Sequence, residues 1–509
     1  MTGRSYRFAD ASRPGLVLGL AGRQLAPLIT GVLWLALTLQ LGVPILGIAG
    51  PVLGVTIAFG RWRGTPLAEA LLPTIRLHVT RSTRRTPWAA TPLLATSTNE
   101  TNESRALPPV LAGLELLDVP HRGRTGRTGR VAVVHDRRAG TLTVCIRVRG
   151  HQFALAAPDT QDQLLGRWGA ALSPLARERS PIVRCTWQEW AHPLSDRAHH
   201  DFLTSIYTDT RPDPHPDPTF DDYLALLDQQ SPRTITHQTL LTLTIDQRRT
   251  RRRHGISPVA AAIDALLDEL DQLANRLETA ELTVETILTP AELATAIRVR
   301  SDPTTARQLD TLHQAHRNHE QHESLATATG RIPIEWTPST VDTTWSNVHV
   351  DGTWHRSYRI ATWPPLPVGA EWLGPLITST DATRTLTVTL EPVPMSRAAR
   401  AADREVMGRE ADADLKTRKG FRVTARERKR LADVEARERE LSEGHAEFRF
   451  VGLVDVTAPT LDDLDDACAT VEQAAAQSLV DLRPLDARHD LGWVAALPLG
   501  RNVATRISR

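Results

Sequence analysis

The sequence is poor in lysine, cysteine and aromatic residues. Lysine occurs only as Lys416, Lys419 and Lys429, and none of the three follows a glycine. A Walker A loop needs Gly-Lys-Ser/Thr, because its lysine reaches the β- and γ-phosphates and its hydroxyl holds magnesium. The missing Gly-Lys pair therefore excludes P-loop nucleotide hydrolysis by these 509 residues.

The cysteines and the charge balance exclude further classes. Cys145, Cys185 and Cys468 are odd in number and far apart, so they predict no disulfide framework and no cysteine-based metal site. Sixty basic and 59 acidic side chains rule out a wholly basic nucleic-acid coat and a wholly acidic solvating chain. No HExxH or GxSxG motif occurs. We therefore expect no enzymatic activity and no cofactor.

One segment lacks charge altogether. Between Arg23 and Arg61 there is no acidic or basic residue, and the run is long enough for two apolar helices. Because a membrane span needs roughly 17–25 residues, we predict two transmembrane helices at Leu25–Leu41 and Val43–Gly60. The flanking Arg23, Arg61 and Arg63 predict that both ends lie on the cytoplasmic side of the membrane.

Three glycines in the second apolar stretch, Gly47, Gly50 and Gly54, predict close packing of the two helices. Small residues spaced by four let helix backbones approach each other in lipid. The remaining chain has no comparable apolar run. The expected location is the cytoplasmic membrane, with the body on its cytoplasmic side.

The rest of the chain alternates predicted strands and helices, which indicates an α+β fold with two lobes. Strands are predicted, for example, at Ile182–Trp190 and Asn347–Thr362, and a helix at Asp159–Glu178. The predicted divisions are the hairpin with basic flanks at 1–90, a first α+β lobe at 91–212, a segment completing that lobe and crossing over at 213–340, and a second α+β lobe at 341–509 with a charged helical hairpin at 396–443.

Two polar clusters are weaker candidates. Arg248, Arg249, Arg251, Arg252 and Arg253 form a basic run that is a candidate contact for nucleic-acid or lipid phosphates, although a solvated loop balanced by nearby acids is the favoured interpretation.

The second cluster is His313, His316, His319 and His322, which recur every three residues. On a helix the first and the last of them face opposite sides, so they favour a solvated connector over a metal site.

Several segments of the body resemble one known family. Val348–Pro364 (VHVDGTWHRSYRIATWP) is similar to a strand in the N-terminal domain of the large ATPases of type IV secretion and conjugation. Arg384–Pro394 (RTLTVTLEPVP), the charged hairpin and Phe450–Thr457 continue the order of that domain, and Leu491–Arg501 (LGWVAALPLGR) resembles its closing stretch. The sequence ends at Arg509, where the motor domain of that family would begin.

The N-terminal part resembles a second component of the same systems. Phe59–Gly64 (FGRWRG) and the following Leu67-Ala68-Glu69 are similar to the exit of a PrgI-like two-helix inner-membrane subunit, which is often fused ahead of that ATPase. The chain thus resembles a motor-less, membrane-anchored relative of the kind found in actinobacterial integrative and conjugative elements.

This resemblance implies a non-enzymatic scaffold of a type IV secretion apparatus. Its implied partners are the cytoplasmic membrane, a separate P-loop ATPase and a polytopic inner-membrane channel subunit. A membrane-tethered adaptor that binds DNA and a membrane-anchored enzyme with an unrecognised site remain alternatives. The sequence leaves open whether the protein forms a homo-oligomer.

The strand within Val348–Pro364 supplies candidate docking residues. Trp354, Arg356 and Tyr358 share one strand face in a chain that is only 5% aromatic. Interface anchors favour Trp, Tyr and Arg, so these three side chains are candidates for binding the ATPase. The alternative is that they belong to the core of the second lobe.

Overall fold

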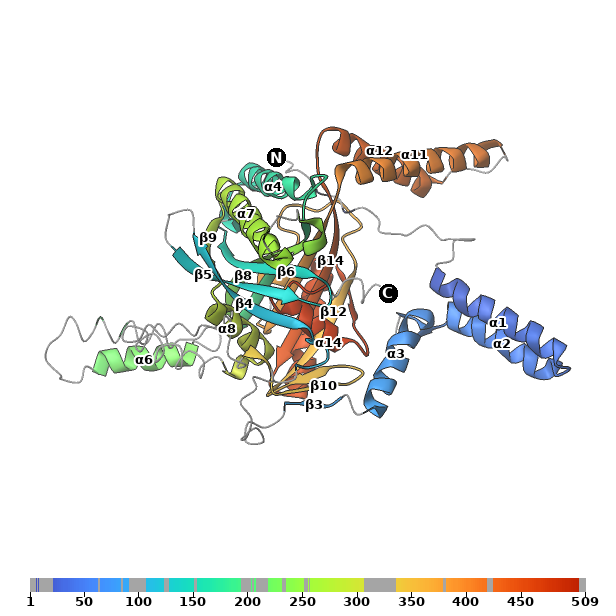
Figure 1. Ribbon diagram of the computed structural model, residues 1–509, viewed down its shortest axis with the longest axis horizontal. Helices are drawn as coiled ribbons and strands as arrows, with labels where there is room; N and C mark the ends of the chain where they lie inside the picture. Colours follow the sequence, from blue (N-terminus) through green and yellow to red (C-terminus); the bar gives the residue numbers. More distant parts are fainter. Residues whose placement is uncertain are drawn as a thin grey trace.

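The computed structural model describes most of the chain as one body with projecting helices (Figure 1). The described residues are 6, 8, 22–62, 65–83, 86–90, 107–122, 128–150, 153–193, 203, 206, 218–230, 235–250, 255, 257–305, 336–378, 381–418 and 424–502. They form 12 α-helices and a large antiparallel sheet of 13 strands. The α+β class predicted from the sequence is therefore confirmed.

A single sheet runs through the body. Its strands, in order along the sheet, are β3 (Trp88–Ala89), β10 (Thr340–Thr343), β11 (Val348–Val350), β12 (Thr353–Thr362), β14 (Glu447–Ala458), β13 (Arg384–Val393), β7 (Ile182–Pro193), β8 (Ile235–Asp246), β6 (Thr141–Arg149), β5 (Thr128–Asp136) and β4 (Leu114–Arg122). In addition, β15 (Asp481–Pro484) pairs with β12, and β9 (Thr283–Ile287) pairs with β6. The N-terminal half of the body supplies β4–β9 and the C-terminal half supplies β10–β15.

The two halves repeat the same topology. In each, a hairpin strand (β6 or β12) pairs with the strand before it, with a later long strand (β8 or β14) and with a short strand (β9 or β15). The repeat extends to single hydrogen bonds, because Leu288 N donates to Cys145 O at 3.0 Å and Leu485 N donates to Ser357 O at 2.9 Å. An internal duplication of one α+β unit explains this correspondence.

The halves join edge to edge through β7 and β13. Thr186 and Thr385 occupy equivalent places in their halves. Thr186 pairs with Thr389, which is four residues after Thr385. In the same way, Thr385 pairs with Trp190, which is four residues after Thr186. This reciprocity places a local two-fold axis between β7 and β13, and it fuses both halves into one sheet.

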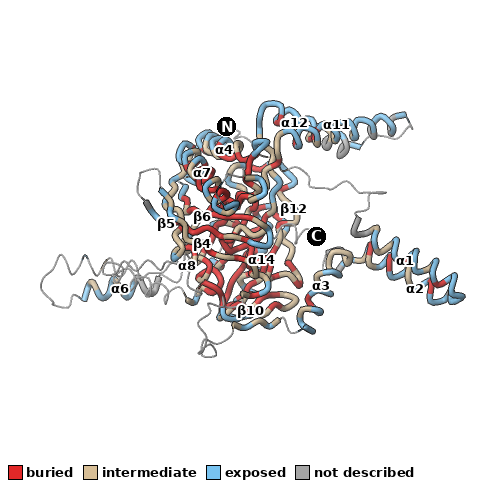
Figure 2. The backbone as a smooth tube through the Cα atoms, in the orientation of Figure 1, coloured by how far each residue is buried: buried red, intermediate tan, exposed pale blue. Residues whose placement is uncertain are grey.

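Helices cover both faces of the sheet. They are α4 (Pro158–Leu172), α7 (Pro258–Thr279), α8 (Pro290–Ser301), α10 (Gly374–Thr378), α13 (Leu461–Gln477) and α14 (His489–Ala496). On β5, Ala132 and Val134 pack in the cluster that contains α8 and α14, whereas Val131 and Val133 pack in the cluster that contains α4 and α7. The helices α10 and α13 cover the C-terminal half in a third cluster. Figure 2 shows that the buried chain follows the sheet and these helices.

Local sequence explains where these elements begin and end. Thr289 caps α8 through a capping box with Glu292. The helix predicted at Asp159–Glu178 instead ends at Leu172 and continues as a 3-10 turn over Ser173–Ala176. Pro174 explains this ending, because proline has no N–H for an α-helical hydrogen bond.

The predicted strand Asn347–Thr362 is corrected to two strands. Asp351 and Gly352 turn the chain between β11 and β12, and Asp351 adopts the left-handed φ of 49° that Asp tolerates in tight turns. The Asp-Gly pair flanked by β-branched residues was the available turn signal.

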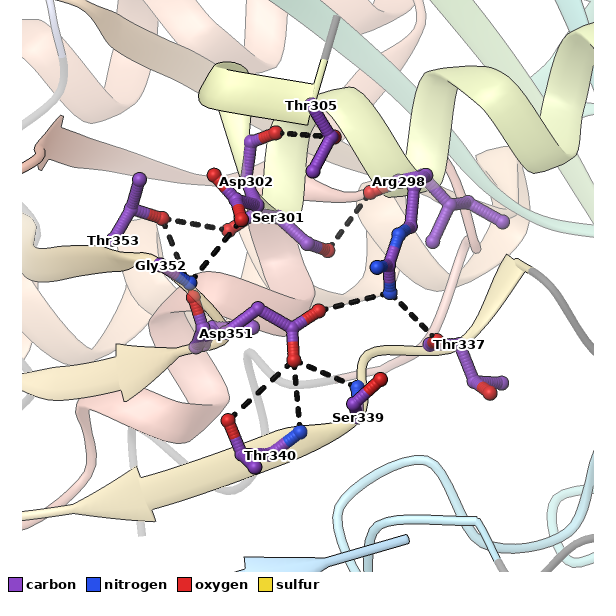
Figure 3. A network of polar contacts seen from close by, with 12 residues as sticks. Arg298, Ser301, Asp302, Thr305, Thr337, Ser339, Thr340, Asp351, Gly352 and Thr353 are labelled. Carbon is purple, nitrogen blue, oxygen red and sulfur yellow. Dashed lines mark hydrogen bonds and ion pairs between the residues drawn. The ribbon is translucent and has the colours of Figure 1, made fainter. Parts of the chain in front are cut away.

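A polar network holds this turn against the end of α8 (Figure 3). Arg298 Nη1 lies 2.8 Å from Asp351 Oδ2 and donates to the Thr337 carbonyl at 2.9 Å. Asp302 Oδ2 accepts a hydrogen bond from Gly352 N at 3.1 Å. The last helix of the N-terminal half thereby fixes the first hairpin of the C-terminal half.

The same arrangement recurs with the halves exchanged. Arg501, which follows α14, places its Nε 3.6 Å from Asp136 Oδ2 at the β5–β6 turn. Its guanidinium also donates to the carbonyl groups of Val110 and Ala112, just before β4. An arginine of each half thus pairs with an aspartate of the other half, and the two pairs hold the halves together.

Three groups of helices project from this body (Figures 1 and 2). They are α6 (Pro218–Gln230), the charged pair α11 (Met395–Arg418) and α12 (Ala425–Ser442), and the apolar pair α1 (Gly22–Gln40) and α2 (Pro44–Phe59), which is followed by the short strands β1 (Arg61–Trp62) and β2 (Thr65–Pro66) and by α3 (Leu67–Ser82). The helices α6 and α11–α12 occupy equivalent places in the duplication, between β7 and β8 and between β13 and β14.

The predicted membrane spans need a correction. Among the described residues, none of the helices combines the length and the apolar character that crossing a membrane requires. The helix α2 has 16 residues, which is about 24 Å at 1.5 Å per residue, against a hydrocarbon core of about 30 Å. The helix α1 has 19 residues, but its first turn contains Arg23 and Gln24. The predicted helix pair is therefore present, but neither of its helices meets both requirements for a span.

The apolar pair is attached to the body on both sides. Before it in the chain, Tyr6 forms an antiparallel bridge with Val368 and its hydroxyl donates to Asp162 Oδ1 at 2.6 Å. The Phe8 ring stacks on Trp363 at 5.3 Å between centroids. After it, α3 leads to β3, which pairs with β10. Described residues that precede and follow the hairpin in the chain therefore contact the body.

Candidate functional site

The hairpin α1–α2 carries its large apolar side chains on the outside. The side chain of Ile45 is 85% exposed, and those of Leu33 and Leu53 are 64% and 61% exposed. The exposed set comprises Ile29, Val32, Leu33, Trp34, Leu37, Leu39, Leu41, Val43, Ile45, Leu46, Ile48, Val52, Leu53, Val55 and Phe59. A surface of this size without a charged residue marks an interaction with lipid or with another protein.

Small residues fill the contact between the two helices. A Cβ atom placed on Gly54 would lie 2.6 Å from the Pro27 carbonyl oxygen, and one on Gly50 would lie 2.5 Å from Trp34. Gly47 faces Thr38 in the same way, and Gly31 of α1 faces the Gly50 carbonyl at 2.6 Å. The sequence pointed to Gly47, Gly50 and Gly54, whereas Gly31 was missed because no other small residue lies four positions from it in its helix.

Four polar side chains of the hairpin form hydrogen bonds within it. The hydroxyls of Thr30, Thr38 and Thr56 donate to carbonyls three or four residues earlier in their own helices at 2.8–3.0 Å. Trp34 Nε1 donates to the Leu46 carbonyl of the facing helix at 3.2 Å. The hydrogen bonds of these side chains are made within the protein, as is required of polar groups in lipid, where no water is available.

The flanking arginines are placed in part. Arg61 lies in β1 and is exposed. Arg23 belongs to the first turn of α1, but its side chain lies outside the described residues, as does Arg63 altogether.

The helix α3 extends the apolar surface. Leu71, Leu72, Ile75 and Val79 are 43–66% exposed. At 100° per residue they cover a stripe about 100° wide on one side of the helix. Leu77 lies on the opposite side and is buried at 8% exposure. A helix with such an exposed stripe is suited to the surface of a membrane.

The predicted docking residues on β12 have different environments. Tyr358 is buried at 2% exposure in the cluster with α13, so it belongs to the core. Arg356 is partly buried, and its Nη1 lies 2.7 Å from Asp465 Oδ1 on α13. Trp354 is partly buried and its ring centroid lies 4.3 Å from that of His349. Only Arg356 and Trp354 thus reach the surface.

A groove opens beside Arg356. It has a volume of about 520 Å³, and Trp345, Tyr358, Asp465 and Glu472 are among its lining residues. Asp465 and Glu472 belong to α13, and Asp465 is paired with the guanidinium. The groove therefore brings Trp345 and Tyr358 together with Arg356, residue types that are enriched at protein interfaces.

The other face of β12 carries a buried network of catalytic residue types. Ser357 Oγ donates to Asp455 Oδ1 at 2.6 Å, and His355 Nδ1 lies 2.9 Å from Asp455 Oδ2. In a nucleophilic triad the serine donates to the histidine, which the carboxylate orients. Here the carboxylate bridges serine and histidine, and all three residues are at most 3% exposed. The arrangement is structural.

His489 of α14 belongs to the same network. Its Nδ1 accepts a hydrogen bond from Ser357 N at 3.1 Å, which requires an unprotonated Nδ1. Burial, with a smaller contribution from the nearby Arg356 guanidinium, lowers the pKa of His489 to about 3. His489 is therefore neutral at physiological pH and links α14 to β12.

The remaining candidates are placed only in part. Arg248 and Arg249 form an exposed 3-10 turn after β8, whereas Arg251, Arg252 and Arg253 lie outside the described residues. The four histidines from His313 to His322 lie outside them as well. In the part of the chain that the structure describes, no group of three metal-ligating side chains comes together.

Comparisons with known proteins add no relative. Neither a scan against protein-family models nor a search of the curated proteins finds a match for this chain.

Proposed function

We propose that this protein is a membrane-attached, non-enzymatic scaffold of a type IV secretion apparatus. The hairpin α1–α2 enters the cytoplasmic membrane from its cytoplasmic face and returns to the same face, with α3 on the membrane surface. The duplicated body, with its two lobes, lies on the cytoplasmic side. There it docks a separate P-loop ATPase beside a polytopic channel subunit.

The observation that supports membrane attachment is that the hairpin is packed in the opposite way to a water-soluble protein. Its buried positions hold small residues, and its large apolar side chains point outward. Removing a half-exposed aliphatic side chain from water stabilises by about 1 kcal/mol, so the exposed set sums to on the order of 10 kcal/mol. That is comparable to one buried acyl chain, at about 0.8 kcal/mol per CH₂ group.

Vesicle flotation tests the attachment. The full-length protein, purified in mild detergent and reconstituted, should float with phosphatidylcholine vesicles. It should stay with membranes during high-salt and carbonate washes, because apolar burial does not depend on salt. A protein that sediments free of vesicles, or that salt alone extracts, would contradict membrane insertion.

The scaffold role rests on the resemblance of Val348–Pro364 and the segments after it to the N-terminal domain of the secretion ATPases. The groove beside Arg356 supports it, because it offers an aromatic and charged surface of suitable size. In this proposal ATP hydrolysis belongs to the partner chain.

Substitution of Arg356 tests the docking surface. Arg356 pairs with a carboxylate that is 65% exposed and donates from Nε to the Ser346 carbonyl at 3.2 Å, so Arg356→Ala should change the free energy of unfolding by about 1–2 kcal/mol and leave the body folded. Loss of an arginine anchor should weaken co-purification of the ATPase by tenfold or more, since such anchors contribute about 2 kcal/mol.

The matched control is Arg483→Ala on the neighbouring strand β15. Arg483 is a partly exposed arginine paired with Asp481 at 3.4 Å, and it does not line the groove. It should retain full ATPase binding. Equal binding by the Arg356→Ala and Arg483→Ala proteins would reject this groove as the docking surface.

A further inference from the structure

A second cavity lies where α3 meets the body. It has a volume of about 480 Å³, within the size range of small-molecule sites. Its described lining residues include three arginines, Arg76 of α3, Arg138 of the β5–β6 turn and Arg488 before α14, and one acidic residue, Asp490. We propose that this cleft binds the phosphate of an anionic phospholipid headgroup.

The charge of the cleft favours an anionic ligand. Neighbouring arginines on the same elements have partners: Arg81 lies 3.7 Å from Asp342, and Arg137 lies 2.9 Å from Glu115. Within the described residues, neither Arg76 nor Arg138 forms such an ion pair. Guanidinium groups bind phosphate oxygens through paired, charge-assisted hydrogen bonds, so two uncompensated ones in one cleft suit a phosphate group.

The position of Arg76 on α3 favours a lipid as the source of that phosphate. Arg76 lies about 40° beyond the edge of the exposed apolar stripe formed by Leu71, Leu72, Ile75 and Val79. When that stripe lies in the membrane interface, Arg76 stands at the level of the headgroups. Arginine at such a boundary keeps its stem in apolar surroundings and its charge among phosphates.

The apolar part of the lining fits the rest of such a ligand. Leu77, Trp88 and Val341 line the same cleft. They offer contact for the glycerol and upper acyl carbons that adjoin a headgroup phosphate. A soluble phosphate ion would leave this apolar wall in contact with water.

This proposal rests on the membrane attachment proposed above, and its test separates the two. Full-length protein is floated with vesicles of phosphatidylcholine alone and with vesicles containing phosphatidylglycerol. The variant Arg76→Gln/Arg138→Gln removes two cleft charges. The control Arg81→Gln/Arg137→Gln removes two charges from the same helix and the same turn outside the cleft.

We expect all three proteins to float equally on phosphatidylcholine. The wild type and the control should bind the anionic vesicles more tightly, and the cleft variant should lose about tenfold in this preference, given the usual contribution of basic residues at an anionic surface. An equal loss in both variants would show diffuse charge attraction and overturn the site. A wild type that floats on no vesicle would instead refute the membrane attachment.

A titration of the detergent-solubilised protein with inorganic phosphate tests whether the bound phosphate belongs to a lipid headgroup or to a soluble compound. Weak or undetectable binding of the free ion, together with lipid preference, supports the headgroup. Saturable phosphate binding that the cleft variant loses, without any preference for anionic vesicles, would assign the cleft to a soluble phosphate compound and overturn the lipid proposal.

Discussion

The double substitution Leu33→Asp/Leu53→Asp is expected to abolish vesicle binding. Both side chains lie near the middle of their helices and are more than 60% exposed, so the substitutions remove little packing within the protein. A charged residue at the centre of a membrane helix costs about 3 kcal/mol. Two such charges together cost about 6 kcal/mol, or roughly four orders of magnitude in partitioning.

The control for this experiment changes apolar residues of similar exposure elsewhere. Leu155, between β6 and α4, is 88% exposed, and Leu415 on α11 is 53% exposed. The protein Leu155→Asp/Leu415→Asp should float like the wild type. Circular dichroism should show that both double variants remain folded. If the hairpin variant still floats, the apolar hairpin does not insert into lipid, and its exposed surface must then be covered by a protein.

The hairpin is the part of the molecule that sequence reasoning predicted best. A charge-free run split by Gly42 and Pro44 specifies two helices, and Gly50 and Gly54 specify their contact. The helix ends were predicted less well. The helix α2 begins at Pro44, which suits a first helical position, and ends before the extended Gly60. These local signals make α2 begin one residue later and end one residue earlier than the predicted Val43–Gly60.

The single sheet could not be predicted in the same way. Each half folds around strands whose alternation is visible in the sequence, but the pairing of β7 with β13 joins segments almost 200 residues apart. No local pattern indicates which strands lie edge to edge. The internal duplication is also hidden, because α6 in one half corresponds to the α11–α12 hairpin in the other and the equivalent strands share few residue types.

The face of β12 shows the limit of strand parity. Parity correctly placed Trp354, Arg356 and Tyr358 on one side. Strand parity could not show that α13 buries Tyr358 but leaves Arg356 partly exposed. The polar network on the opposite face could not be predicted, because His355 and Ser357 both hydrogen-bond to Asp455, which lies about 100 residues later in the sequence.

Asp455 is therefore the residue of the body whose loss should be most damaging. It lies on β14 between β12 and β13, is 3% exposed, and accepts hydrogen bonds through both carboxylate oxygens. Asp455→Ala would leave the buried Ser357 hydroxyl and His355 imidazole without this partner. Because removing one member of a buried polar pair costs about 3–5 kcal/mol, the variant should lose a large part of the stability of the body.

Urea denaturation of the full-length protein in detergent measures this loss. Asp455→Asn should show a smaller one, because its carboxamide oxygen can still accept from one of the two side chains. The comparison variant Asp465→Ala removes a carboxylate that is 65% exposed, and its effect should stay below about 1 kcal/mol. If Asp455→Ala unfolds within about 1 kcal/mol of the wild type, the network does not hold β12 and β14 together. A large loss of stability in Asp455→Ala, together with a small one in Asp465→Ala, would show that the buried carboxylate of Asp455 stabilises the C-terminal half.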